Sequence, residues 1–408
     1  NLSARTMCAA PAAGMPGARS WPRSTTSTSR TTRPETPPAD CGVPGDHGMN
    51  AGAVTTLAVD AMGGDHGPAP VVDGLAKALR AAPDLRAIVY GREDEVGPLI
   101  HRRRRDLNGR VELRPSEGVV SMDARPRDAL RDGEATSMWG TLSAVAEGDA
   151  DAAVSCGNTG ALMLMAMMRL KKAPLVDRPA IAVFWPSRNP GGWTIVLDVG
   201  ADVRAEPWSL AQYAVMGAEY ARIGLDVERP RVGLLNVGSE DNKGRPEIKE
   251  ARALLERAAE AGRYEWTGNV EGGDVARGRA DVVVTDGFTG NVALKTAEGT
   301  ASFIGDELRQ AFTHSPLSRL AALAAYTSLK RMKRRIDPRR ANGGVFLGLS
   351  GAVVKSHGGA DATGVAAAIA LAARMGRTGF AEKVAAGVAR LGAPQAAGLS
   401  SDAKAAAQ

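Results

Sequence analysis

The stretch LAVDAMGGDHGP, residues 57–68, decides the fold class of this chain. A short apolar run ends in Asp60, and two glycines, a second acid and a histidine lead through Pro68 into a helical pattern. An apolar run that passes through a glycine turn into a helix is typical of a strand–turn–helix unit. Because ligands of α/β proteins bind at the carboxyl ends of strands, we expect this strand end to be one wall of a site.

Short apolar runs alternate with helical patterns along the rest of the chain. Strands are predicted at 57–60, 87–90, 111–114, 152–155, 181–185, 193–198, 231–236, 264–268, 281–285 and 352–356. Helices are predicted near 69–81, 137–147, 160–171, 208–223, 246–261, 290–312 and 361–375. This alternation favours a mostly parallel sheet with helices on both faces. The segment 186–192 is too short for a crossover helix, so we expect a hairpin there and a mixed sheet.

The composition is that of a globular protein with a large core. The chain has 408 residues, of which 44% are hydrophobic, enough for one large α/β domain or two. No apolar run approaches the roughly 18 residues of a membrane span, and the longest, 161–168, is interpreted as a buried core helix. The three cysteines, Cys8, Cys41 and Cys156, show neither disulfide nor metal-ligand spacing, which fits a reducing, cytosolic setting.

Both ends of the chain differ from residues 54–392, in which we expect the α/β domain. Residues 1–53 are rich in Ser, Thr, Pro, Arg and Gly and have no hydrophobic period, a composition that cannot bury a core. We expect translation to start naturally at Met49 and residues 1–53 to be a mis-annotated extension; a real disordered or targeting tail is the alternative. Residues 393–408 are expected to be a disordered tail.

The basic character of the chain is local. Lysines and arginines number 51 and acids 45, a net charge of +6, and the stretch from Arg319 to Arg340 has eight basic residues and one acid, or +7. The remainder therefore sums to −1. This segment, within 313–340, is predicted to be a basic amphipathic helix over 316–336.

Apolar surface beside a cationic end is typical of helices that bind an anionic membrane surface. The residues expected at that surface are Leu320, Leu323, Tyr326, Lys330, Arg331, Lys333 and Arg334. An ordinary packed surface helix and docking of an acidic protein are the alternatives. Nucleic-acid binding is not expected, because the segment has a single aromatic residue for base stacking.

Polar residues and glycines follow seven of the predicted strands. We expect these strand ends to converge on one edge of the sheet and to form a binding site there, although glycines after strands are often only turns. The residues expected in the site are Asp60, Gly63, Gly64, Asp65, His66, Gly157, Asn158, Thr159, Gly160, Asp198, Asn236, Asn269, Glu271, Asp286, Gly287, Thr289, Gly290, Asn291 and His357.

Two of these turns point most directly to an anion of the size of phosphate. In 286–295 a glycine turn opens into a helix whose first N–H groups would face an anion, and Lys295 lies on the same helix face as Asn291. The segment 155–160 has the same form. The alternatives are a solvated surface lysine in the first case and a plain helix cap by Asn158 or Thr159 in the second.

The motifs that mark several other kinds of site are missing from the sequence. The dinucleotide-binding pattern Gly-x-Gly-x-x-Gly does not follow the first strand, and the Gly-x-x-x-x-Gly-Lys-Ser/Thr motif is absent. No Gly-x-Ser-x-Gly elbow indicates a serine hydrolase. Of the five histidines, His66 and His357 are the two at strand ends in the body of the fold.

Six motifs in order resemble one family. They are DAMGGD at 60–65, SCGNTGA at 155–161, LDVGA at 197–201, NVEGGD at 269–274, DGFTGN at 286–291 and KSHG at 355–358. Over residues 55–390 the chain is similar to the PlsX family of bacterial phosphate acyltransferases. Two positions depart from that family: Cys156 stands where alanine is common, and 131–136 lacks the usual run of basic residues.

The resemblance implies transfer of a fatty acyl group from acyl carrier protein to inorganic phosphate, giving acyl phosphate for glycerol-3-phosphate acylation. It implies a three-layer α/β/α sandwich similar to isopropylmalate dehydrogenase and phosphotransacetylase, a cytoplasmic homodimer that associates peripherally with the membrane, and acyl-phosphate:glycerol-3-phosphate acyltransferase as the downstream partner. No metal or organic cofactor is expected.

This chemistry suits the residues. Phosphate attacks a thioester itself, so that the protein must supply anion binding, alignment and hydrogen-bond donors. We assign catalytic roles to Lys295, His357, Asp60 and Asn236, with His357 or His66 as a donor to the carbonyl or the sulfur, and substrate binding to the other site residues. A phosphotransacetylase-like enzyme that uses acyl-coenzyme A and a non-enzymatic membrane scaffold for lipid-synthesis enzymes are the alternatives.

Overall fold

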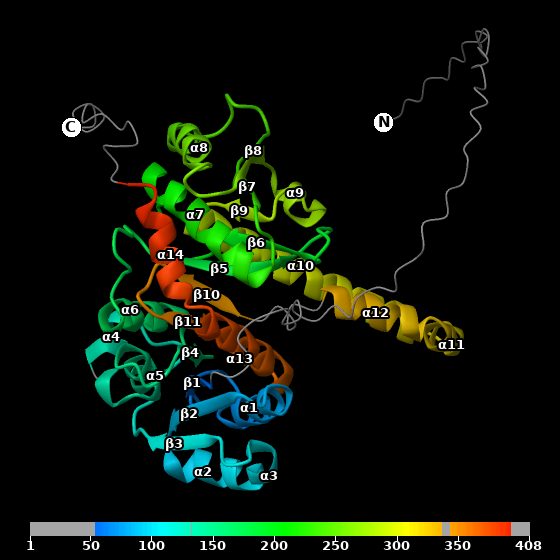
Figure 1. The fold of residues 1–408 in the computed structure, drawn as a ribbon. Helices are drawn as coiled ribbons and strands as arrows, with labels where there is room; N and C mark the ends of the chain where they lie inside the picture. Colours follow the sequence, from blue (N-terminus) through cyan, green and yellow to red (C-terminus); the bar gives the residue numbers. More distant parts are fainter. Residues whose placement is uncertain (1–53, 132, 337–342, 393–408) are drawn as a thin grey trace, which may run out of the picture. The chain divides into compact units, whose positions relative to one another are not determined.

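The computed structural model describes residues 54–131, 133–336 and 343–392, with side chains described to Met332 in the second range. These residues belong to one compact unit, Cys41–Gln408. The tails predicted at 1–53 and 393–408 lie outside the described residues. Figure 1 shows the fold.

The described strands form a single sheet. They are β1 (Thr55–Asp60), β2 (Leu85–Gly91), β3 (Val111–Pro115), β4 (Ala152–Ser155), β5 (Ala180–Pro186), β6 (Trp193–Leu197), β7 (Arg231–Leu235), β8 (Glu265–Val270), β9 (Val282–Val284), β10 (Gly344–Leu347) and β11 (Ala352–Lys355). Their order is β3-β2-β1-β4-β11-β10-β5-β6-β9-β7-β8.

The sheet consists of two parallel sets that run in opposite directions. The strands β3, β2, β1, β4 and β11 are mutually parallel, as are β6, β9, β7 and β8. Between the sets lie three antiparallel pairings, β11–β10, β10–β5 and the predicted hairpin β5–β6. An odd number of antiparallel pairings reverses the direction. The prediction that all polar strand ends share one edge is therefore wrong, because the carboxyl ends of the two sets lie at opposite edges.

Helices cover both faces of the sheet. Those described are α1 (Ala69–Ala81), α2 (Glu93–Arg102), α3 (Arg104–Leu107), α4 (Pro126–Arg131), α5 (Ser137–Ala146), α6 (Thr159–Arg169), α7 (Pro207–Gly224), α8 (Pro246–Ala258), α9 (Gly272–Arg277), α10 (Gly287–Thr313), α11 (Pro316–Ala324), α12 (Tyr326–Ile336), α13 (Ala362–Arg377) and α14 (Phe380–Ala389), with a 3₁₀ turn at Gly133–Ala135.

Alternate residues of each strand enter different cores, as the two-residue period of a strand requires. Leu57 and Val59 of β1 join one core cluster with residues of α1, α7 and α13, whereas Ala58 faces α5. Ala153 of β4 and Val353 of β11 join a third cluster with α6. Helices thus lie on both faces, and the predicted α/β fold with a mostly parallel mixed sheet is confirmed.

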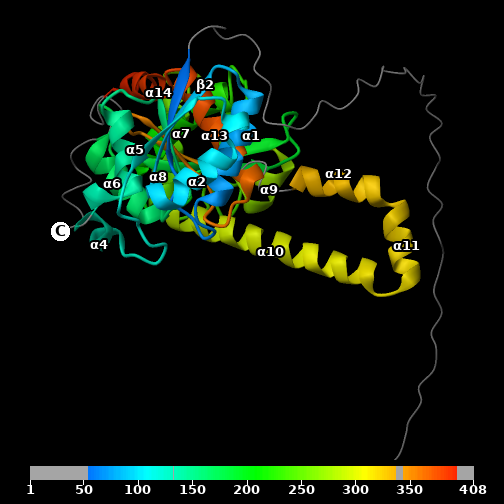
Figure 2. The ribbon, with the colours of Figure 1, turned by 90° about the horizontal axis from the view of Figure 1, so that it is seen from below.

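The helices α10, α11 and α12 continue away from the sheet (Figure 2). From Asn291 onward no described side chain of these helices is fully buried. The single helix predicted over 316–336 is wrong, because the chain turns at Ala325, where α11 ends and α12 starts in a new direction. Among the described residues, no helix is long and apolar enough to cross a membrane.

Candidate active site

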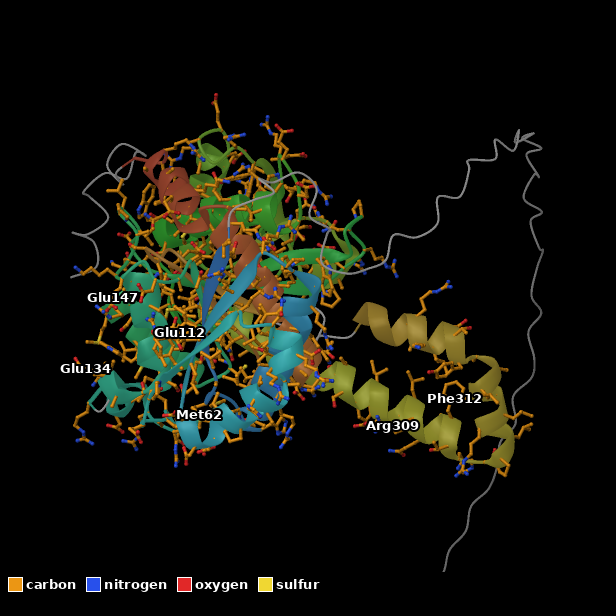
Figure 3. All side chains as sticks on the ribbon, turned by 60° about the horizontal axis from the view of Figure 1, so that its bottom comes forward. Met62, Glu112, Glu134, Glu147, Arg309 and Phe312 are labelled. Atoms are coloured by element: carbon orange, nitrogen blue, oxygen red, sulfur yellow. The ribbon has the colours of Figure 1, made fainter. Side chains whose placement is uncertain are left out.

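One edge of the sheet is organised by the carboxylate of Asp60, which ends β1. Asp60 is 1% exposed and accepts four hydrogen bonds. Its Oδ1 accepts from the N–H groups of Met62 and Gly63, both at 3.1 Å, and from Ser137 Oγ at 2.7 Å, while Oδ2 accepts from Ser155 Oγ at 2.7 Å. A fully bonded buried carboxylate holds its neighbours in place. Asp60 therefore ties the ends of β1 and β4 to the start of α5; Met62 is labelled in Figure 3.

Glycines let three chain segments touch beside Asp60. A Cβ on Gly63 would lie 2.6 Å from the main-chain N of Gly157, and one on Gly157 would lie 2.5 Å from the methyl carbon of Met138. Gly64 has a φ of +105° and lies against the carbonyl of Gly358. Only glycine allows main chains to approach this closely. The glycines of the opening stretch therefore serve close packing of strand ends.

Asn158 is the N-cap of α6, as the alternative interpretation of this turn had it. Its Oδ1 accepts from the N–H of Ala161 at 3.0 Å, and its Nδ2 donates to the carbonyls of Met122 and Ala124. The side chain thereby anchors the loop before α4 over the strand ends. Thr159 and Gly160 are exposed, and no acceptor for their N–H groups lies among the described residues.

Lys355 ends β11 directly beside Ser155 of β4. It is 9% exposed, and its Nζ donates to the carbonyl oxygens of Cys156, at 3.2 Å, and Ser356. Burial, with a smaller effect of the Lys295 charge, lowers the pKa of Lys355 to about 8, against the opposing effects of Cys156, Asp60 and Asp65. Sequence reasoning did not assign Lys355 to the site, although it is in the KSHG motif.

Lys295 reaches this same edge from α10. The helix begins after β9 at the opposite edge, and eight residues at 1.5 Å each carry Lys295 about 12 Å along it. Its Nζ pairs with Glu298 at 2.8 Å, and the side chain is 59% exposed. Because its charge acts on Lys355, the two ammonium groups lie in the same neighbourhood.

The predicted histidines and Asp65 lie at the exposed rim of this edge. His66, Asp65 and His357 are exposed. His357 Nδ1 accepts from the N–H of Gly359 at 3.0 Å, which places the proton of the neutral ring on Nε2. The N–H of Asp65 donates to the carbonyl of Gly358, so the loops that carry the two histidines are joined.

Cys156 lies in the floor of this edge as a buried thiol. It is 3% exposed, and burial raises its pKa to about 11. A thiol of this pKa is almost wholly protonated at neutral pH and is a poor nucleophile. Among the described residues, no group of His, Cys, Asp and Glu side chains is arranged to hold a metal ion.

The remaining predicted residues gather at the opposite edge of the sheet. Asp198, fully buried, accepts hydrogen bonds from the N–H groups of Ile181, Gly200, Ala201 and Asp202. Burial raises its pKa above the ordinary value, and these N–H groups oppose the shift. Asn291 Nδ2 donates to the carbonyl of Val199 in the same loop. Asp198 and Asn291 thus hold the loop after β6.

A carboxylate of the protein already occupies the N-terminus of α10. Asp286 Oδ1 accepts from the N–H of Thr289 at 2.8 Å, Oδ2 accepts from the Thr289 hydroxyl, and Arg245 pairs with Asp286 at 2.9 Å. The N–H groups of Gly287 and Gly290 donate to carbonyls of Asp202 and Asp286. Little capacity remains there for a second anion.

Asn236, Asn269 and Glu271 also bond within this second edge. Asn236 Nδ2 donates to the carbonyl of Lys243, and Asn269 Nδ2 to that of Glu240. Glu271 caps α9 in a capping box with Asp274. The sequence thus identified residues from two separate clusters as one site, and their roles in substrate binding or catalysis stay predictions.

The arrangement of sheet and helices is that of an α/β/α protein with the phosphotransacetylase fold. EutD phosphotransacetylase from Staphylococcus aureus and a phosphotransacetylase from Streptococcus pyogenes each superpose with a TM-score of 0.51 and 18% identity. Each comparison covers 79% of this chain and 94% of the other. At this identity the likeness shows the fold alone.

The chain belongs to the fatty acid synthesis protein family, whose family model matches residues 55–383. It is 60% identical over 336 residues to a protein of Cereibacter sphaeroides named phosphate acyltransferase, covering 82% of this chain and 90% of that one. A Paracoccus denitrificans protein of the same name is 58% identical over 347 residues, 85% and 92% of the two chains. The predicted membership of the phosphate acyltransferase family is confirmed.

Proposed function

We propose that this protein transfers a fatty acyl group from acyl carrier protein to inorganic phosphate and so makes acyl phosphate for phospholipid synthesis. The observation that carries the proposal is its 60% identity to proteins named phosphate acyltransferase. The edge of the sheet at which β1, β4 and β11 end supports the proposal, because its lysines, glycine turns and uncommitted N–H groups of α6 suit an anion. The acceptor is phosphate and the donor is a thioester.

The reaction balances without a protein nucleophile. An oxygen of HPO₄²⁻ bonds to the thioester carbon, and the C–S bond breaks with its electron pair on sulfur. The proton that the phosphate carried ends on the leaving thiol, and nothing is oxidised or reduced. A thiol of pKa about 8.5 is a good leaving group, so alignment and charge stabilisation are the main tasks. The protonated, buried Cys156 has no part in this scheme.

Within this scheme Lys295 and the turn 157–160 hold the phosphate. The N–H groups of Thr159 and Gly160 point from the first turn of α6, where the helix dipole favours negative charge. His357, with its proton on Nε2, donates to the carbonyl oxygen or the sulfur of the thioester. Asp60 supports the site indirectly, because its carboxylate fixes the turn at Met62 and Gly63.

The direct test measures acyl phosphate, trapped with hydroxylamine, from purified protein with palmitoyl-acyl carrier protein and phosphate. We expect formation that depends on both substrates and is faster with the carrier-protein thioester than with palmitoyl-coenzyme A. Equal or faster rates with coenzyme A would favour the phosphotransacetylase-like alternative. No acyl phosphate from either donor, with retained binding to anionic vesicles, would favour a scaffold.

The α10–α12 region is proposed to bind the cytoplasmic face of the membrane peripherally. Its exposed apolar side chains support this: Leu317 is 76% exposed, Leu323 71% and Leu320 63%. Lys330 lies 5.7 Å from the ring centre of Tyr326, and Arg331 beside it is exposed. Apolar surface next to cations suits anionic lipids.

A homodimer is proposed to use part of the same region. Phe303 on α10 is 64% exposed and Ile304 is 49% exposed, and isolated proteins seldom leave neighbouring apolar side chains of this size in water. Arg309 and Phe312, further along α10, are labelled in Figure 3. The product is proposed to pass to acyl-phosphate:glycerol-3-phosphate acyltransferase at the membrane, which keeps a reactive anhydride out of bulk water.

A further inference from the structure

Lys355 is a buried ammonium group without a carboxylate partner. Its Nζ donates only to two main-chain carbonyls among the described residues, those of Cys156 and Ser356, and no acid lies within ion-pair distance of it there. Buried charges in proteins are normally paired, because an unpaired charge removed from water costs free energy. An ammonium group has three donors, so one N–H of Lys355 has no acceptor assigned.

The nearest acids do not satisfy this charge. Asp60 acts on Lys355 through space, but both of its oxygens are engaged with Met62, Gly63 and two serines. Asp65 also acts on it, from the exposed loop after β1. Lys295 adds a second positive charge to the same neighbourhood. Glu298 pairs with Lys295, whereas Lys355 Nζ bonds only main-chain carbonyls, so that an anion beside Lys355 would be stabilised.

The surrounding main chain supplies further donors and little space. The uncommitted N–H groups of Thr159 and Gly160 come four and five residues after Ser155, the neighbour of Lys355 in the sheet. Gly63, Gly157 and Gly358 keep side chains out of this region, since a Cβ on any of them would meet an atom within 3 Å. A small tetrahedral anion suits a position that is bounded this closely better than a carboxylate on a protein partner does.

We propose that Lys355 binds the phosphate substrate directly, as the fixed positive charge of the phosphate site at the carboxyl ends of β4 and β11, with Lys295 as the outer, solvent-exposed cation. This inference rests on phosphate being a substrate, as proposed above. Lys355 touches the reacting phosphate and neutralises part of its charge, which helps the attacking oxygen approach the thioester. Its two carbonyl bonds fix the direction in which the third N–H points.

The test compares Lys355→Met, Lys355→Arg, Lys295→Met and the control Lys383→Met, which removes an exposed lysine of α14. We expect Lys355→Met to raise the KM for phosphate about 10- to 100-fold, the effect of losing a hydrogen bond to a charged group, with little change in the KM for acyl donor. Lys355→Arg should recover part of the loss, and Lys383→Met should behave as wild type. An unchanged phosphate KM in Lys355→Met overturns the inference.

A second readout needs no turnover. Phosphate should raise the thermal unfolding midpoint of the wild type, and Lys355→Met should lose that rise. If Lys355→Met fails to fold, the wild type and Lys355→Arg are compared from pH 7 to 10. Because Lys355 loses its proton near pH 8, phosphate stabilisation should weaken above that pH in the wild type and persist in the arginine variant. Identical pH profiles would refute the inference.

The two proposals fail separately. Lys355-dependent stabilisation by phosphate without acyl phosphate from any thioester refutes the function and leaves the phosphate site standing. Acyl phosphate formation with an unchanged phosphate KM in Lys355→Met refutes the site and leaves the function standing.

Discussion

Replacing Asp60 by alanine removes the acceptor that joins three segments of the first edge. Four buried donors lose their partner: the N–H groups of Met62 and Gly63 and the hydroxyls of Ser137 and Ser155. Each buried donor left unsatisfied costs about 1–3 kcal/mol, so that the lower bound sums to about 4 kcal/mol. In a chain of this size, each kcal/mol of lost unfolding free energy lowers the thermal unfolding midpoint by about 2 °C. The midpoint of Asp60→Ala should therefore fall by about 8 °C.

Differential scanning calorimetry or fluorimetry at pH 7.5 measures this change. Asp128→Ala is the matched control, because Asp128 on α4 is exposed and has no side-chain hydrogen bond among the described residues; its midpoint should move by less than about 1 °C. Asp60→Asn, which keeps one acceptor oxygen, should fall between the two. A midpoint within 2 °C of wild type in Asp60→Ala, together with lost activity, would show that Asp60 acts in the reaction and not in the scaffold.

Three further predictions concern other regions. In Gly290→Ala the new Cβ would lie 1.9 Å from a main-chain oxygen, so that folded yield should collapse, whereas Gly299→Ala on the same helix meets nothing within 4 Å and should gain up to about 1 kcal/mol in thermal unfolding. The pKa of Lys355 is about 8 when folded and 10.5 when unfolded, so that the unfolded state holds the extra proton between these values and stability rises with pH across that window. Relative to Lys355→Met, the wild type without phosphate should gain up to about 3 kcal/mol from pH 8 to 10.5 in denaturant titrations; a flat difference would contradict the burial of a charged lysine. Leu320→Glu with Leu323→Glu should abolish sedimentation with anionic phosphatidylglycerol vesicles and spare acyl transfer in solution, and retained binding would count against α11 as the membrane surface.

The fold class could be predicted from the sequence because the two-residue and 3.6-residue periods of hydrophobic residues are strong in this chain. The strand at 57–60 and the helix at 69–81 coincide with β1 and α1 within two residues. The hairpin around 186–192 was predictable from its length alone. The strand β10 and the helices α2, α3, α4, α9 and α14 were missed. For α3, α4 and α9, which have four to six residues, the reason is that so short a helix carries too few periods to be distinguished from a loop.

Only part of the candidate site could be predicted from the sequence. The motifs mark strand ends, but a motif does not state the direction of its strand, and the reversal between β5 and β6 sends Asp198 and Asp286 to the opposite edge. Lys355 was overlooked because a lysine at the end of an apolar run looks like a solvated strand terminus. Its burial arises from packing of β4 and β10 on either side, which is a tertiary effect.

Crystals soaked in phosphate, or in arsenate for its anomalous signal, would locate the anion site. We expect one tetrahedral anion within hydrogen-bond distance of Lys355 Nζ and of the N–H of Gly160, at the edge where β1, β4 and β11 end. An anion bound by Arg245 at the start of α10, with none beside Lys355, would contradict it.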